Sequence, residues 1–206
     1  MTNLSTSHLK SVGGNLFLNM KTGTKSILFG SHQFIIHPIV LFLAWWKLYG
    51  FPFDPRLWVV FAVHDLGYFS KPNIDGPEGE KHVEFGANIV GRLFGPAWRD
   101  LCLYHSRFYA KRSNKLFSRL CVADKLAIVL EPWWFYLPRI WLSGEVKEYV
   151  NAASLEKYAN EGRDISSVKA WHSSMIKYLR DWIQEHKDKH EDTWTLLPKG
   201  DEKWDN

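Results

Sequence analysis

Apolar residues recur with a helical period along most of the 206-residue chain, and few segments alternate in the way that strands do. Asp54 and Pro55 form the clearest start signal, because aspartate caps a helix and proline suits its first position. Gly50 is placed to end the preceding helix. The pattern predicts an all-α protein, with helices at residues 34–49, 54–67, 80–94, 97–110, 115–131, 145–152 and 167–186.

The chain length predicts one main domain, since domains commonly hold about 100–200 residues. We expect residues 1–30 to be an N-terminal extension and residues 31–150 to form the main helical domain. Residues 151–206 are expected to add a C-terminal helix and a tail packed on the same domain. From Glu191 onward, charges mixed with Pro198 and Gly200 predict a loose tail.

Composition narrows the class of protein. Hydrophobic residues make up 46% and charged residues 23%, which is ordinary globular usage and argues against disordered or collagen-like chains. The formal net charge of +4 is too mild and too dispersed to indicate binding to nucleic acid, which is therefore an unlikely partner. A small anionic molecule is compatible with this charge. Cys102 and Cys121 lie in apolar patterns without CxxC spacing, which predicts core thiols in a reducing, cytoplasmic compartment.

The aromatic content is high, with 11 Trp and 13 Phe. The N-terminal 20 residues lack the features of a secretory signal. The apolar run Pro38–Trp46 is far shorter than the roughly 20 residues of a spanning helix, so we expect a buried helix and no transmembrane segment. The stretch Trp133–Trp141, interrupted by Pro138, is expected at most to lie on a membrane surface. Three of its side chains are alternatively expected to wall a pocket: Trp133, Trp134 and Tyr136.

Four histidines stand on successive predicted helices, and two aspartates accompany them. Asp65 directly follows one of these histidines, and Asp124 lies in the apolar phrase LCVADKLAI. A buried carboxylate without a partner costs several kcal/mol, and a metal cation removes that cost. The candidate metal ligands are His37, His64, Asp65, His82, His105 and Asp124.

Imidazoles and carboxylates without thiolates suit first-row divalent metals such as Fe, Mn, Zn or Co. Six groups exceed the needs of one four-coordinate ion, so we expect two ions bridged by the two carboxylate oxygens of Asp65. His32 is an alternative to His37, or a residue that lines the pocket. The remaining histidines are expected on the surface: His8, His172, His186 and His190.

The order of these residues resembles the HD superfamily of metal-dependent phosphohydrolases, whose pattern is H…HD…H…H…D on a helical bundle. The phrases HPIVLFLA, FAVHDLGY, HVEFGANIV and VADKLA carry the resemblance, which covers residues 34–130. It implies an HD-domain helical bundle with additional C-terminal helices. It also implies that one ion is held by His37, His64, Asp65 and Asp124, and the other by Asp65, His82 and His105.

The resemblance implies a phosphohydrolase that cleaves a phosphate ester or anhydride of a small nucleotide-like substrate with metal-activated water. Mixed-valence diiron oxygenases of the same superfamily, which cleave C–P or C–C bonds, are the first alternative. A binding or regulatory module that has lost turnover is the second. Oligomeric state stays open.

Several polar residues adjoin the candidate ligands. Arginine suits phosphate oxygens and neutralises charge that develops in the transition state. We expect catalytic roles for Asp65, Lys81 and Arg107, and substrate-binding roles for Ser106, Lys111 and Lys125. Possible proton carriers are Asp75, Glu78 and Glu84.

Overall fold

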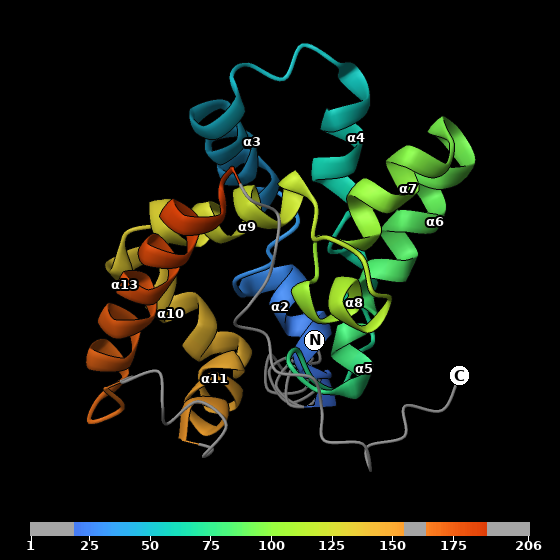
Figure 1. Cartoon of the computed structure of the whole chain (residues 1–206). Coiled ribbons are helices and arrows are strands. Elements are labelled where there is room, and N and C mark those ends of the chain that lie inside the picture. Colours follow the sequence, from blue (N-terminus) through green and yellow to red (C-terminus); the bar gives the residue numbers. More distant parts are fainter. Residues whose placement is uncertain (1–18, 155–163, 189–206) are drawn as a thin grey trace, which may run out of the picture.

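A computed structural model describes residues 19–154 and 164–188, and within these ranges every regular element is helical (Figure 1). The predicted all-α class is therefore confirmed. The predicted tail after residue 190 lies outside the described residues. The elements are α2 (Thr22–Phe29), α3 (Ile36–Tyr49), α4 (Pro55–Val63), the 3-10 turn η1 (Leu66–Tyr68), α5 (Pro77–Glu80), α6 (His82–Phe94), α7 (Pro96–Leu103), α8 (Arg107–Arg112), α9 (Arg119–Leu130), α10 (Trp133–Ser143), α11 (Glu145–Ser154) and α13 (Val168–His186).

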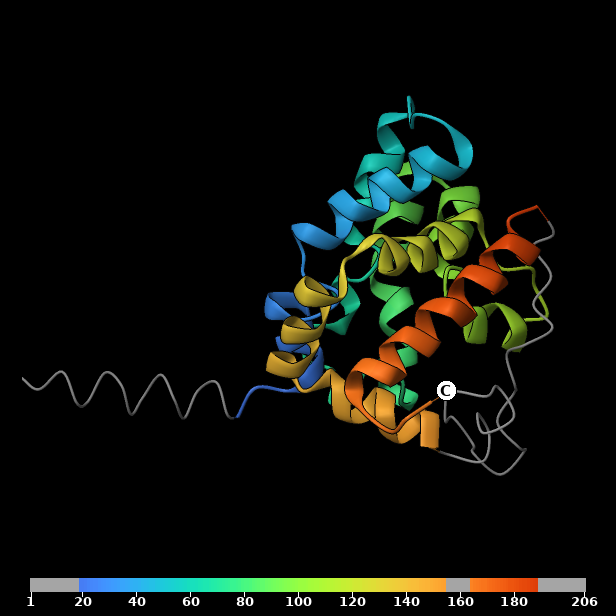
Figure 2. The same ribbon diagram turned by 90° about the vertical axis from the view of Figure 1, so that its left-hand side faces the viewer.

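Helix α9 occupies the centre of the bundle. It packs against α3, α7 and α13, while α6 packs against α4 and α7 (Figures 1 and 2). Buried residues run along α9 from Leu120 to Ala127 with one half-buried interruption, Lys125. Because α9 is enclosed on several sides, Asp124 is carried into the interior beside His37 of α3.

Local signals explain where the helices begin and end. The Asp54 side chain accepts a hydrogen bond from the Arg56 N–H at 3.0 Å, directly before Pro55 at the first position of α4. Ser167 caps α13 in the same way by accepting from the Ala170 N–H at 3.1 Å. Gly50 ends α3 with a φ of 86°, a conformation that glycine adopts at little cost.

Some predicted helix bounds are wrong. The helix expected at 97–110 is broken, because Ser106 caps a new helix, α8, by accepting a hydrogen bond from the Tyr109 N–H. The break leaves His105 in the connection, where it is free to turn inward. The helix expected at 54–67 ends at Val63 and continues as η1, while α2 and α10 form where no helix was predicted. Helix α10 continues through Pro138.

His172 and His186 were expected on the surface, and both are buried on α13. The ring of His186 stacks on the Trp182 ring with centroids 4.6 Å apart, and its Nδ1 lies 2.9 Å from the Trp182 carbonyl oxygen. The expectation failed because these imidazoles share the packing face of an amphipathic helix. His8 and His190 lie outside the described residues.

The expectation of a buried helix at Pro38–Trp46 is only half right. Helix α3 buries Leu41, Ala44 and Trp45, but Ile39, Leu43 and Trp46 on its other side are exposed. Trp133 and Trp134 are exposed as well, while Tyr136 is buried. Cys102 and Cys121 are buried and form no disulfide, so their predicted place in the core is confirmed. Among the described helices, none has the length and hydropathy required to span a membrane.

A buried carboxylate joins the region of α2 to α10 and α11. Glu145, at the start of α11, is fully buried and accepts hydrogen bonds from the Ser26 hydroxyl at 2.7 Å and the Ser31 N–H at 3.0 Å. The Ser143 hydroxyl also donates to it. Burial alone would raise the pKa of Glu145, but hydrogen bonds, first from His32 and then from the serines, lower it to about 2. Glu145 therefore fixes α2 against α10 and α11.

Glu145→Gln is expected to destabilise the protein by about 3 kcal/mol at neutral pH, since a pKa shift of one unit corresponds to about 1.4 kcal/mol. A lowered folded-state pKa adds stability above the ordinary value of 4.5, and this stability is lost as the pH falls towards 2. Urea unfolding at several pH values measures both effects. The control is Glu185→Gln on the exposed side of α13. Equal stability of wild type and Glu145→Gln at pH 7 would contradict this role.

Candidate metal centre

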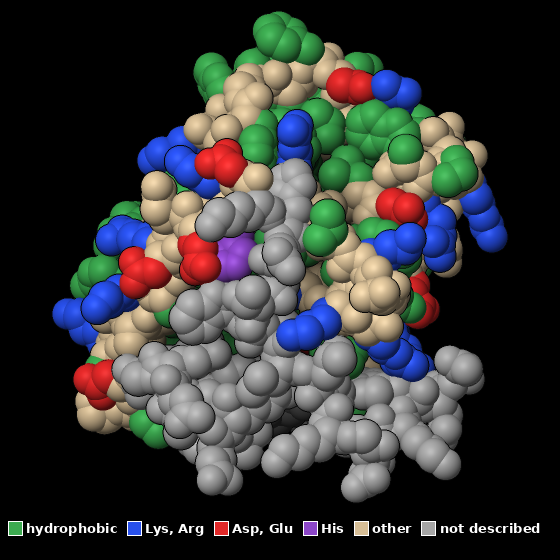
Figure 3. Space-filling model, in the orientation of Figure 1, with side chains coloured by type: hydrophobic (Ala, Val, Ile, Leu, Met, Phe, Trp, Pro, Cys, Tyr) green, Lys and Arg blue, Asp and Glu red, His purple; other side chains and the backbone are tan. Residues whose placement is uncertain are grey.

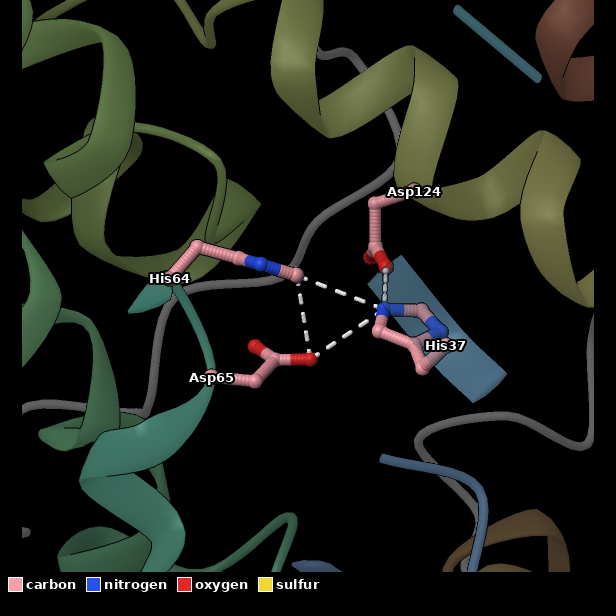
Figure 4. Close-up of side chains that lie close together, drawn as sticks. All are labelled: His37, His64, Asp65 and Asp124. Carbon is pink, nitrogen blue, oxygen red and sulfur yellow. Dashed lines mark hydrogen bonds and ion pairs between the residues drawn. The ribbon is translucent and has the colours of Figure 1, made fainter. Parts of the chain in front are cut away.

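The first ligand group joins α3, α4 and α9 (Figure 4). His37 lies in the first turn of α3, His64 directly follows the last residue of α4, and Asp124 lies in the middle of α9. The Nε2 atom of His37 is 3.1 Å from Asp124 Oδ1 and 3.3 Å from Asp65 Oδ2. The Nε2 atom of His64 is 3.1 Å from the same Asp65 oxygen. Four buried side chains thus point their donor atoms at one point.

The second group lies on the other side of Asp65. His82 begins α6, and His105 lies between α7 and α8. Their Nε2 atoms are 3.5 Å and 3.3 Å from Asp65 Oδ1 and 3.1 Å from each other. Asp65 therefore presents one carboxylate oxygen to each group, which is the arrangement that a bridging carboxylate requires.

Backbone carbonyls fix the orientation of three imidazoles. The Nδ1 atoms of His64, His82 and His105 lie 3.1, 2.7 and 2.5 Å from the carbonyl oxygens of residues 61, 79 and 102. Because a carbonyl oxygen only accepts, each Nδ1 carries the proton and donates. In the neutral ring, Nε2 then holds a lone pair directed at the centre, which is the form that ligates metals.

Both ligand groups stabilise a positive charge among their side chains. Burial would lower the pKa of His37, but the carboxylates of Asp124 and Asp65 raise it to about 10. Burial would likewise lower the pKa of His105, but the Asp65 carboxylate, together with Cys102, raises it to about 10. Burial lowers the pKa of His64, and that of His82 falls well below its ordinary value. In each group, one histidine is therefore stabilised as a cation beside a carboxylate: His37 in the first group and His105 in the second. A metal ion supplies that charge without a proton.

The donor set fits divalent metal ions. In each group the ligand atoms all lie within 4.8 Å of one another, and all six residues are buried. Asp65 Oδ2 is enclosed without a hydrogen-bond donor among the described residues. The Nε2 atoms of His82 and His105 face each other at 3.1 Å, so a proton or a metal ion must lie between their lone pairs. These buried groups can hold two metal ions that share Asp65.

Two of the predicted substrate-binding residues lie beside the ligands. The Lys125 ammonium is 2.8 Å from Asp124 Oδ2. Burial would lower the pKa of Lys125, but the charge of Asp124 raises it above its ordinary value, so the side chain stays cationic. The Ser106 hydroxyl donates to Glu80 Oε2 at 2.9 Å. The third predicted residue, Lys111, lies in the last turn of α8, and its role stays a prediction.

The predicted catalytic cations are placed differently. The Arg107 guanidinium donates to the Tyr178 hydroxyl at 3.0 Å and lies over the Trp182 ring, so it is engaged with α13. Lys81 immediately precedes His82 and, after the Asn73 amide, helps to lower the pKa of Glu78. A direct role of either cation at the metal ions stays a prediction.

Of the possible proton carriers, two accept hydrogen bonds from other side chains and the third is exposed. Glu78 accepts from the Asn73 amide at 2.6 Å, and Glu84 accepts from the Tyr109 hydroxyl at 2.6 Å. Asp75 is exposed in the loop before α5. None of the three reaches a ligand atom through a hydrogen bond in the described structure.

The sequence argument missed two residues that adjoin the centre. The Tyr68 ring stacks on the His82 ring with centroids 3.8 Å apart. Burial, and then the charge of Asp75, raise the pKa of Glu80 to about 7. Its place two residues before His82 in the phrase GPEGEKH was the available signal. His32, expected to replace His37 or line the pocket, lines a small pocket with His37, His64 and Asp65.

Comparisons with protein-family models, with curated proteins and with solved structures found no match to this chain.

Proposed function

We propose that the protein is a metal-dependent phosphohydrolase that cleaves a phosphate ester or anhydride of a small nucleotide-like substrate. One observation carries the proposal: two buried ligand groups share Asp65, one oxygen to each group. Four imidazoles and two carboxylates without a thiolate suit first-row divalent ions. The resemblance of the ligand order to the HD superfamily supports the same conclusion.

Divalent ions at such a centre supply Lewis acidity, which activates water and neutralises the charge of a phosphoryl group. The residues of the chain contribute binding and orientation. The carbonyls behind His64, His82 and His105 keep each Nε2 directed inward. Lys125 is a fixed cation beside Asp124 and is placed to attract a phosphate oxygen. Together they favour an anionic substrate.

The test uses the full-length protein. Its metal content is measured, the metal is removed with a chelator, and Mn, Co, Zn or Fe is restored. Phosphate release is then followed with p-nitrophenyl phosphate, its bis-ester and nucleotides. We expect activity only with restored metal, and Lys125→Ala is expected to raise KM about tenfold or more, because a charge-assisted contact is worth about 1.5–3 kcal/mol. Lys177→Ala, exposed on α13, is the control.

Two other outcomes would reject the proposal, and each of them favours one alternative function. Bound iron together with oxygen consumption on a phosphonate or polyol, and no phosphate release from any ester, would favour the diiron oxygenase. Metal binding without turnover on either panel would favour a binding or regulatory module.

A further inference from the structure

One face of the bundle exposes an unusual set of large apolar side chains. They lie on the outer side of α3, on the connection to α4 and on α4 itself. Phe53 is 86% exposed, and Trp46 and Trp58 are each 50% exposed. Exposed clusters of this kind mark interaction surfaces on otherwise well-packed proteins. We call the set the aromatic face: Ile39, Leu43, Trp46, Phe51, Phe53 and Trp58.

The aromatic face is ordered. The Phe51 ring contacts the rings of Trp46 and Phe53, with centroids 5.4 Å and 4.8 Å apart. The Trp58 indole N–H donates to the Pro52 carbonyl oxygen at 2.8 Å. In Figure 2, no described helix lies in front of α3, and in Figure 3 hydrophobic side chains gather over the α3–α4 connection. The face is thus a fixed surface whose apolar side chains point outward.

Basic and acidic residues are unevenly distributed along the sequence that carries the aromatic face. The first 53 residues contain four lysines and no aspartate or glutamate, and the rest of the chain holds equal numbers of basic and acidic residues. The entire net charge of +4 therefore belongs to the part of the chain that carries α2, α3 and most of the aromatic face. Lys47 is exposed next to Trp46. Asp54, the first acid, is paired with Arg56 at 2.6 Å.

We propose that the aromatic face docks on the surface of an anionic lipid bilayer. Tryptophan and phenylalanine beside lysine are the side chains that insert at the boundary between headgroups and acyl chains. Anionic headgroups attract the exposed ammonium group of Lys47, and the charge of Asp54 beside the face is neutralised by Arg56. A second copy of the chain fits less well, because a two-fold contact through this face brings the Lys47 side chains of both copies together.

The small pocket beside the ligands lies near the N-terminal end of α3. Phe34, which is 47% exposed before α3, lines the pocket that also contains His37 and Asp65. The proposal does not depend on the phosphohydrolase activity, so the two can fail separately.

Flotation of the full-length protein with vesicles tests the proposal. Vesicles of phosphatidylcholine with phosphatidylglycerol are expected to carry the protein, vesicles of phosphatidylcholine alone to carry less, and added salt to weaken binding. Phe53→Ser is expected to weaken partition about tenfold or more, since burying a phenylalanine is worth about 1.5–3 kcal/mol. Leu93→Ser, equally apolar and 62% exposed on α6, is the matched control and is expected to bind normally.

A second pair of variants tests the charge. Lys47→Glu is expected to weaken binding to anionic vesicles more than Lys177→Glu, which makes the same charge change on α13. Failure of the folded wild-type protein to float, or equal losses in Phe53→Ser and Leu93→Ser, would overturn the proposal. So would a wild-type dimer that Phe53→Ser dissociates, in the absence of vesicle binding. Circular dichroism confirms that each variant is folded.

Discussion

Asp65→Asn is expected to lose both metal ions while it keeps its helical content. The substitution removes the negative charge that both ligand groups share and replaces one carboxylate oxygen with a donor N–H, which repels a cation. Affinity is expected to fall by more than the about 100-fold that the loss of an outer-shell partner can cost. Metal analysis after dialysis, together with circular dichroism, measures the two quantities.

Two further variants make this result specific. His105→Gln disturbs only the second group, so it is expected to retain one ion per chain where the wild type holds two. His172→Gln replaces an imidazole that is buried outside both groups and is expected to retain two. If Asp65→Asn kept full metal content, the shared carboxylate would have no role in binding.

Gly67→Ala is expected to cause a large loss of stability and of the second ion. A Cβ atom at this position would lie 1.9 Å from the carbonyl oxygen of His82, so η1 must move away from the start of α6. Backbone atoms cannot give way as a flexible side chain does. We expect a loss of at least about 3 kcal/mol, the upper part of the range for overpacking. Separation of η1 and α6 also increases the distance between Asp65 and His82.

Urea unfolding and metal analysis check this prediction. Gly144→Ala is the control, because a Cβ there meets nothing within 4 Å and only the φ of 89° is unfavourable. Its expected cost is about 1 kcal/mol, with both ions retained. A Gly67→Ala variant as stable as Gly144→Ala, with two ions, would show that η1 and α6 need not approach so closely.

The sequence was a good guide to several helix ends that have a local cause. Asp54 with Pro55, Gly50 and Ser167 act on their nearest neighbours, and the structure has helix ends at all three places. The break at His105 was missed, because the apolar pattern continues through it and the cap of Ser106 is a single side-chain contact. Helix α10 was missed because Pro138 argues against a helix that the surrounding packing nevertheless maintains.

Contacts between residues far apart in the chain limit what the sequence predicts about individual side chains. The buried carboxylate of Glu145 meets Ser31, 114 residues earlier in the chain, and no local pattern announces such a contact. Arg107 stands next to a candidate ligand in the sequence, yet its guanidinium binds Tyr178 on α13. The exposed side of α3 reads in the sequence like its buried side, since both are apolar.

By itself, the sequence determined the helical class of this protein, the chemical kind of its candidate ligands and their order along the chain, because periodicity, capping and residue type are properties of short segments. Only the tertiary structure decided that Asp65 faces two groups, that carbonyls orient three imidazoles, and that one side of α3 has no described helix over it. These features depend on how helices distant in the chain pack, and packing is a property of the whole bundle.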